Sequence, residues 1–156
     1  MNITSERKRG FAYVSEYADV VTLPVRGTRH SGAYDFFSPE DIVLRPGETY
    51  ALKTGIKSYM LPDEVLLVFI RSSMGKKDLE LRNKVAVIDS DYYNNLDNEG
   101  NIILMLRNTS LSSSIVEIKR GDKVAQGMFV KYLLADGDGF DVHQGVRNGG
   151  IGSTGT

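Results

Sequence analysis

The chain has 156 residues and a formal net charge of −1 at pH 7, so it is most simply one domain with a sizeable core. Hydrophobic residues make up 41% and charged residues 25%, as in ordinary globular proteins. The small net charge gives no general attraction to nucleic acid or anionic membranes, so we expect neither as a partner. There is no cysteine and there are two histidines, which excludes disulfides, thiolate nucleophiles and cysteine-based zinc sites and argues against a histidine-built metal centre.

The N-terminal region lacks the pattern of a signal peptide. Residues 1–9 carry charges with no apolar run behind them, and the longest apolar stretch, Val65–Ile70, is far too short to span a bilayer. We therefore expect a soluble protein with a cytoplasmic location.

Short apolar runs separated by turn residues predict an all-β fold. Residues 50–60 alternate with a period of about two, and Val65–Ile70 is continuously apolar, as expected for a strand buried on both faces. Four further runs of strand character follow, at Val85–Ile88, Ile102–Leu106, Ile115–Ile118 and Lys123–Val130. Many short strands at near-regular spacing indicate a β-sandwich or barrel.

One short helix and a C-terminal arm complete the predicted organisation. Ser72 or Ser73 can cap a helix that continues over residues 74–81. After residue 135 the chain becomes polar and rich in glycine, so we expect a single β domain over 1–135 and a flexible arm over 136–156. Its last eight residues contain four glycines and three hydroxyl side chains, which suits either a solubilising tail or a flap that wraps a phosphate.

Arg71, Ser72 and Ser73 form the first candidate binding site, between a strand and the expected helix. Helix N-termini present unpaired N–H groups to anions, and an arginine with two hydroxyls would add donors for phosphate. A plain helix cap beside a solvated arginine explains the same residues.

Asp89, Asp91 and Tyr92 form the second candidate, at the end of a strand. A carboxylate there can act as a general base toward water, and two carboxylates two residues apart can also bind a cation. An Asx-type turn with Tyr92 packed on the core is the alternative. Further along, a charged turn at 119–123 precedes the strand that carries Gln126. Arg147, on the expected arm, either reaches a terminal phosphate or is solvated.

Five segments in this order resemble the five motifs of the homotrimeric deoxyuridine triphosphatases (dUTPases). They are Ser31–Phe36, Arg71–Gly75, Val87–Tyr92, Arg120–Gln126, and Arg147 with Gly149–Gly155. The resemblance covers about Leu23 to Thr156. The polar segment Asn94–Glu99, which looks like an insertion, is similar to that of dUTPases from Gram-positive bacteria and their phages.

This resemblance implies a fold, an assembly and a reaction. The fold would be a distorted jelly roll (a β-clip) that forms a homotrimer, with three active sites at the subunit interfaces. The reaction would be the Mg²⁺-dependent hydrolysis of dUTP to dUMP and pyrophosphate, which limits the incorporation of uracil into DNA. If a phage encodes the chain, the location would be the host cytoplasm.

The resemblance also implies roles for individual residues. Asp89 matches the general base that orients water for in-line attack on the α-phosphorus. Tyr92 matches the aromatic residue that packs on the deoxyribose and leaves no room for a 2′-hydroxyl, and Asn83 lies on the hairpin that reads uracil. Asp35 matches a residue that reaches the metal through water. The other substrate-binding positions implied are Arg71, Ser72, Ser73, Gln126, Arg147, Ile151, Gly152 and Ser153.

The chain departs from the family pattern at a few positions. Lys84 and Ala86 stand where close relatives usually carry glycine in the uracil hairpin. Arg147 is one residue closer to the glycine pair than usual, and Ile151 replaces the aromatic residue that stacks over uracil. Such stacking is worth about 1–3 kcal/mol.

Two other functions compete with dUTP hydrolysis. dCTP deaminases share the fold and an Arg-Ser-Ser motif, but they need a glutamate three residues before an asparagine on the strand after the third motif. Here Asn108 has Met105 at that spacing. A regulatory protein of the same fold is the other alternative. The segment Asn94–Glu99 could bind its partner, but a tolerated loop extension is the simpler explanation of this segment.

Overall fold

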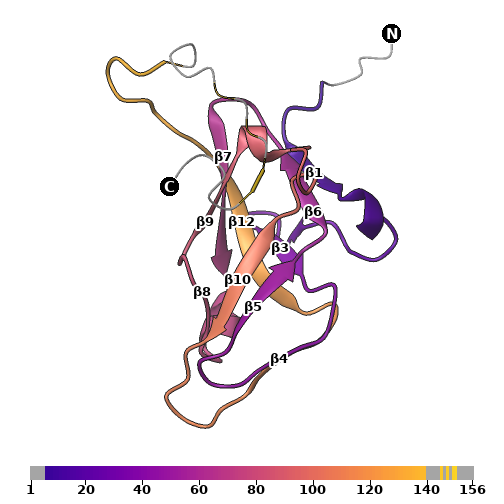
Figure 1. The fold of residues 1–156 in the computed structure, drawn as a ribbon. Coiled ribbons are helices and arrows are strands. Elements are labelled where there is room, and N and C mark those ends of the chain that lie inside the picture. The colour runs from indigo at the N-terminus through magenta and orange to yellow at the C-terminus, as the bar shows by residue number, and fades with distance from the viewer. Residues whose placement is uncertain (1–5, 140–144, 146, 148, 151–156) are drawn as a thin grey trace.

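The chain folds into antiparallel β-sheets with almost no helix (Figure 1). The computed structural model describes residues 6–139, 145, 147, 149 and 150. These residues include one short helix, α1 (Ser72–Gly75), and two 3₁₀ turns, η1 (Ser15–Tyr17) and η2 (Ser90–Tyr92). The strands are β1 (Gly10–Tyr13), β2 (Val25–Arg26), β3 (Tyr34–Phe37), β4 (Ile42–Leu44), β5 (Thr49–Lys53), β6 (Ile56–Tyr59), β7 (Glu64–Ile70), β8 (Leu79–Leu81), β9 (Ala86–Asp89), β10 (Ile103–Asn108), β11 (Val116–Ile118) and β12 (Lys123–Lys131).

The strands form four antiparallel groups. The largest is a five-stranded sheet in the order β2-β3-β12-β7-β9, and a second sheet has the order β5-β10-β8. The pairs β1-β6 and β11-β4 complete the fold. The all-β prediction is therefore confirmed, as a layered arrangement of open sheets.

The core lies between the inward faces of these sheets. Period-two alternation sends Leu66 and Val68 of β7 inward, where they join Phe36 of β3. Leu104 and Leu106 of β10 enter the same core from the second sheet, and all five side chains are fully buried. The outward residues of β7 are only half-buried, so the prediction of a strand buried on both faces is wrong for the single chain: β7 belongs to an antiparallel sheet that packs on one face.

Two other predicted elements also differ from the structure. The helix spans only Ser72–Gly75, with Arg71 at the N-cap position, because Leu79–Leu81 pairs with β10 as a strand instead of continuing the helix. The alternating run 50–60 is split into β5 and β6 by Gly55, which has φ = +72°. A Cβ at that position would lie 2.5 Å from the Tyr17 ring, so glycine lets the chain leave one sheet and enter another.

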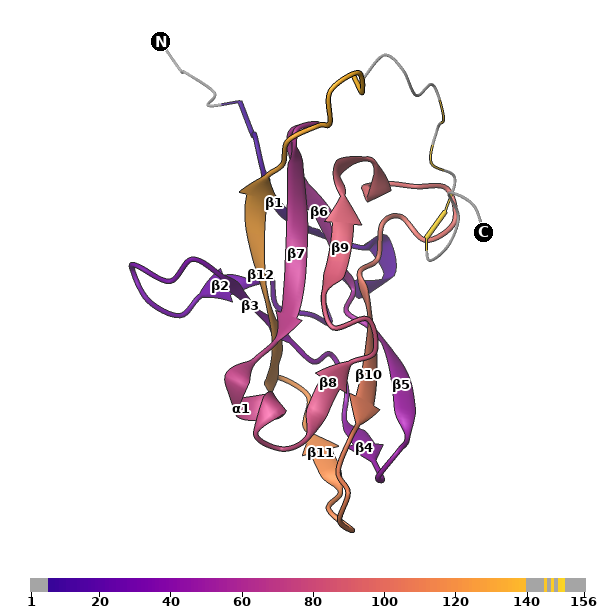
Figure 2. The ribbon, with the colours of Figure 1, turned by 90° about the vertical axis from the view of Figure 1, so that its left-hand side faces the viewer.

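The pairing of β7 with β9 sets the position of the candidate site residues. Val65, near the start of β7, lies opposite Asp89 at the end of β9. Arg71 follows the other end of β7 and leads into α1. Figure 2 shows α1 at one end of β7 and the end of β9 toward the other.

Candidate active site

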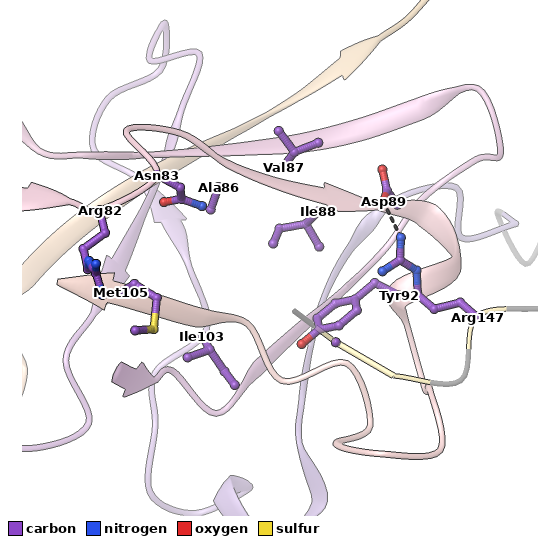
Figure 3. A pocket seen from close by; sticks show the side chains of 11 residues that line it. Arg82, Asn83, Ala86, Val87, Ile88, Asp89, Tyr92, Ile103, Met105 and Arg147 are labelled. Atoms are coloured by element: carbon purple, nitrogen blue, oxygen red, sulfur yellow. Dashed lines mark hydrogen bonds and ion pairs between the residues drawn. The ribbon is translucent and has the colours of Figure 1, made fainter. Parts of the chain in front are cut away.

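A pocket of about 510 Å³ lies between the β8–β9 hairpin and β10 (Figure 3). Its apolar floor comes from β9 and β10, and its polar groups gather at the hairpin and at the end of β9. It is lined by Arg82, Asn83, Ala86, Val87, Ile88, Asp89, Tyr92, Ile103, Met105, Arg147 and Gly150. The volume and the mixture of apolar walls with few polar groups suit a small organic ligand.

The hairpin at one end of the pocket has a strained backbone. Lys84 adopts φ = +63°, and the hairpin is closed by hydrogen bonds from its N–H to the Leu81 carbonyl (2.9 Å) and from the Val85 N–H to the Asn83 carbonyl (2.6 Å). A positive φ favours glycine, so lysine adopts this conformation at an energetic cost. The hairpin nevertheless closes with lysine at this position.

Asp89 lies at the other end of the pocket and pairs with Arg147. One guanidinium nitrogen, Nη2, donates to Asp89 Oδ2 at 2.5 Å, and Nε donates to Asp91 Oδ1 at 2.8 Å. Figure 3 shows the arginine side chain extended between Asp89 and the Tyr92 ring, whose centroid lies 5.9 Å from the guanidinium carbon. The Asp89 side chain makes no capping hydrogen bond to η2, so its carboxylate does not serve the Asx-type turn that was the alternative interpretation.

Tyr92 forms a buried wall of the pocket, with 7% of its surface exposed. Its hydroxyl donates to the Asn101 carbonyl at 2.8 Å and accepts from Asn98 Nδ2 at 2.8 Å. Burial raises the pKa of the phenol, and this effect outweighs the opposing effect of the Asn98 hydrogen bond. The ring therefore stays neutral and presents an apolar face beside Arg147.

A second group of candidate residues, which we call the Asp35 cluster, comprises Asp35, Arg71, Lys123 and Gln126. The buried Asp35 carboxylate contacts Arg71 Nε at 3.2 Å and Lys123 Nζ at 3.0 Å, and Gln126 lies opposite Asp35 in the β12–β3 ladder. Ser72 and Ser73 begin α1 beside the cluster with exposed side chains. The prediction that one of these serines caps the helix is wrong, because Arg71 holds that position. Two cations and two exposed serines gathered here suit an anionic ligand.

The pocket and the Asp35 cluster lie far apart in one chain. Asp89 is opposite Val65, and Arg71 comes six residues later along the extended β7. At about 3.3 Å per residue, this separation is roughly 20 Å. A single chain therefore brings together Asn83, Asp89, Tyr92 and Arg147, and separately Asp35, Arg71, Lys123 and Gln126, but not the two groups. Ile151, Gly152 and Ser153 lie outside the described residues.

Comparison with known proteins identifies the chain. Its sequence matches the family profile of dUTPases over residues 19–155. The chain belongs to the dUTPase family. The deoxyuridine 5′-triphosphate nucleotidohydrolase of Lactococcus lactis is 44% identical over 149 residues, covering 94% of this chain and 97% of the relative.

Solved structures of dUTPases agree with this assignment. The dUTPase from Streptococcus mutans is 42% identical, with a TM-score of 0.75 over 82% of this chain and 99% of that chain. The dUTPase of phage phi11 of S. aureus, in which a structural Mg(II) ion is coordinated, has a TM-score of 0.69 over 86% of this chain and 97% of that chain. At 21% identity the phage enzyme shows a shared fold alone. The predicted membership in the Gram-positive or phage type of dUTPase is confirmed, and so is the predicted β-clip fold.

Several residues of this dUTPase pocket were not predicted from the sequence. Met105 and Ile103 form its floor from β10. Alternation along that strand places both side chains on the face away from the core, but it does not show that this face lines a pocket. Asn98, which contacts Tyr92, lies in the segment Asn94–Glu99 with two other asparagines, where no spacing rule singles it out. Within the described residues, no helix is long and apolar enough to cross a membrane.

Proposed function

We propose that this dUTPase family member hydrolyses dUTP to dUMP and pyrophosphate in the pocket beside Asp89. The observation that carries the proposal is the position of a half-exposed carboxylate at the rim of a pocket of about 510 Å³, which is large enough to hold a nucleoside. Asp89 would act as the general base that orients water toward the α-phosphorus, in line with the leaving pyrophosphate.

The two ends of the pocket suit the two ends of a nucleoside. The hairpin that carries Asn83 lines one end of the pocket and would read the uracil edge through its backbone groups. The buried Tyr92 ring would pack on the deoxyribose and exclude a 2′-hydroxyl. Arg147, which now contacts both Asp89 and Asp91, would move to the phosphate chain when dUTP binds and so release the Asp89 carboxylate.

A homotrimer would combine the two separated groups of residues. Because the Asp35 cluster lies about 20 Å from Asp89 along β7, it cannot contact the same triphosphate within one chain. The cluster of a second subunit, with Arg71, Ser72 and Gln126, would supply phosphate contacts to the pocket of the first. The site is therefore complete only between subunits.

The residues present fit an Mg²⁺ ion that is bound through the substrate. The described part of the chain contains no group of three or more histidine and acidic side chains able to hold a metal. Mg²⁺ usually keeps several waters and takes phosphate oxygens, so it needs no such cage. Asp35 is the residue expected to reach the ion through water, and the ion would neutralise charge on the triphosphate.

An assay of pyrophosphate release tests the proposed reaction. Purified protein with dUTP and Mg²⁺ should release pyrophosphate, and Asp89→Asn, which keeps the shape but removes the base, should lower kcat by about 10²–10⁴-fold with little change in KM. Equal activity of the two proteins would refute the role of Asp89.

Deamination of dCTP is disfavoured by the structure of β10. Met105 lines the pocket with a side chain that cannot move protons. The Asn108 amide is buried and donates to the Leu44 and Ser114 carbonyls, away from the pocket lining. Release of ammonia from dCTP would overturn this conclusion. Partner binding at Asn94–Glu99 stays a prediction.

A further inference from the structure

The loop between η2 and β10 is fastened to the wall of the pocket through Asn98. The Asn98 side-chain amide donates to the Tyr92 hydroxyl at 2.8 Å. Its carbonyl oxygen accepts from Asn95 Nδ2 at 2.8 Å and from the Gly100 N–H at 3.0 Å. One side chain thus connects the pocket wall to both limbs of the loop.

The two hydrogen bonds at the Tyr92 hydroxyl have distinct roles. A phenol has one proton, and Tyr92 donates it to the Asn101 carbonyl. The oxygen can then only accept from its second partner, and Asn98 provides the N–H that this requires. Two hydrogen bonds at the tip of the ring restrict its tilt more than one bond does.

The loop that holds Asn98 is itself well fixed. Asn95 is 6% exposed; its amide donates to the Tyr92 carbonyl at 2.9 Å, and its carbonyl oxygen accepts from the N–H of Asn98 at 3.1 Å. Glu99 accepts hydrogen bonds from Ser15, which ties the loop to η1. Asn98 is therefore a rigid support.

The beginning of the glycine-rich arm also contacts this support. A Cβ on Gly150 would lie 3.2 Å from the Tyr92 hydroxyl and 3.5 Å from Asn98 Nδ2. The backbone of Gly150 thus passes directly over the Tyr92–Asn98 pair. The orientation of that pair therefore affects both the pocket wall and the surface that Gly150 contacts.

We propose that Asn98 is a positioning residue that holds the Tyr92 ring in the orientation that selects a deoxyribose over a ribose. This inference rests on the proposed function, because it assumes that the sugar packs on Tyr92. It assigns the polar loop a part in substrate selection within its own subunit.

The variant Asn98→Asp tests this role. Aspartate keeps an oxygen for Asn95 and Gly100 but replaces the donor to Tyr92 with an acceptor, so the phenol can satisfy only one of two acceptors. We expect the ratio of kcat/KM for dUTP to that for UTP to fall by about three- to tenfold, the range of one hydrogen bond. Leu96→Ala, at an 89% exposed position of the same loop, is the matched control and should leave the ratio unchanged.

A double-mutant cycle with Tyr92→Phe separates positioning from general damage to the fold. If Asn98 acts through the Tyr92 hydroxyl, Asn98→Asp should have no further effect on the ratio in the Tyr92→Phe protein. An unchanged ratio in a folded Asn98→Asp protein would overturn the proposal. The proposal would also be overturned if Asn98→Asp lowered the ratio equally in proteins with and without the Tyr92 hydroxyl.

A binding measurement distinguishes failure of this inference from failure of the proposed reaction. Calorimetry with dUDP and UDP in EDTA needs no turnover, and the preference of the wild-type protein for dUDP should weaken in Asn98→Asp by the same factor. If the wild-type protein binds dUDP selectively but releases no pyrophosphate from dUTP, the proposed reaction is wrong and the calorimetric ratio still decides the role of Asn98. Absence of any preference for dUDP over UDP in the wild-type protein would overturn the inference about Asn98, and pyrophosphate release from dUTP would still decide the reaction.

Discussion

Individual residues around β7 show how charge is used to hold the candidate site in place. Glu64 begins β7 next to Val65, the partner of Asp89, and its carboxylate is 4% exposed. Arg9 donates to it from Nε at 3.0 Å and from Nη2 at 2.5 Å, and the Leu61 N–H donates at 3.1 Å. The N-terminal segment is thereby fastened to the strand that supports the pocket.

The Arg9–Glu64 pair should make stability depend on pH. The Arg9 hydrogen bond lowers the pKa of Glu64 below its ordinary value of 4.5, despite burial. Because the folded pKa is depressed, the stabilisation is fully present above about pH 4.5 and is lost as pH falls through the folded value. We expect Arg9→Met to lower the free energy of unfolding at pH 7, since it leaves the buried Glu64 carboxylate without its main donor.

Urea denaturation at pH 7 and pH 3 measures this effect. The difference between wild-type and Arg9→Met proteins should shrink at the lower pH, because the stabilisation by the ion pair is lost as the pH falls toward the lowered pKa of Glu64. A difference that is the same at both pH values would show that Arg9 contributes through packing instead.

At the scale of elements, the β8–β9 hairpin combines a functional position with backbone strain. Lys84 is exposed, pairs with Glu80 and carries φ = +63°. A left-handed conformation costs a non-glycine residue about 1–2 kcal/mol, and an exposed ion pair recovers little of this.

Substitution of Lys84 separates these two effects. We expect Lys84→Gly to be about 1 kcal/mol more stable than Lys84→Ala, because both lose the ion pair but only glycine relieves the strain. Chemical denaturation of the two variants gives the difference. Equal stabilities would mean that the hairpin relaxes to a negative φ in solution.

The strands were predictable where an apolar run is bounded by turn residues, as in β7, β10 and β12. The errors arose where a long-range contact overrides the local pattern. Leu79–Leu81 follows a helix start, yet its apolar side chains enter the core by pairing with β10. Gly55 interrupts an alternating run because the chain must cross between sheets, which no local signal reveals.

At the scale of the whole molecule, the order of the motifs does not show which of them meet in space. The segments that contain Arg71 and Asp89 are separated by a short stretch of sequence, but the antiparallel β7–β9 pairing sends them to opposite ends of one strand. Asp89, Tyr92 and Asn83 could be predicted to share a pocket from their motif roles. The separation of the Asp35 cluster depends on sheet register, which the sequence alone does not specify.

Complementation between two inactive variants tests the shared site most directly. Asp89→Asn removes the base from the pocket, and Arg71→Ala removes a cation from the Asp35 cluster. If each site takes its pocket from one subunit and its cluster from the next, every mixed trimer keeps one intact site of three. Random mixing yields three quarters mixed trimers, so the mixture should recover about one quarter of wild-type activity.

The measurement is pyrophosphate release from dUTP after the two variants are unfolded together and refolded. The controls are each variant refolded alone and the wild-type protein taken through the same treatment. Light scattering on each sample confirms the trimer. The account predicts low activity in each separate variant and about one quarter of the wild-type rate in the mixture. A mixture that forms trimers but stays as inactive as its components, beside an active wild-type control, would contradict a site shared between subunits.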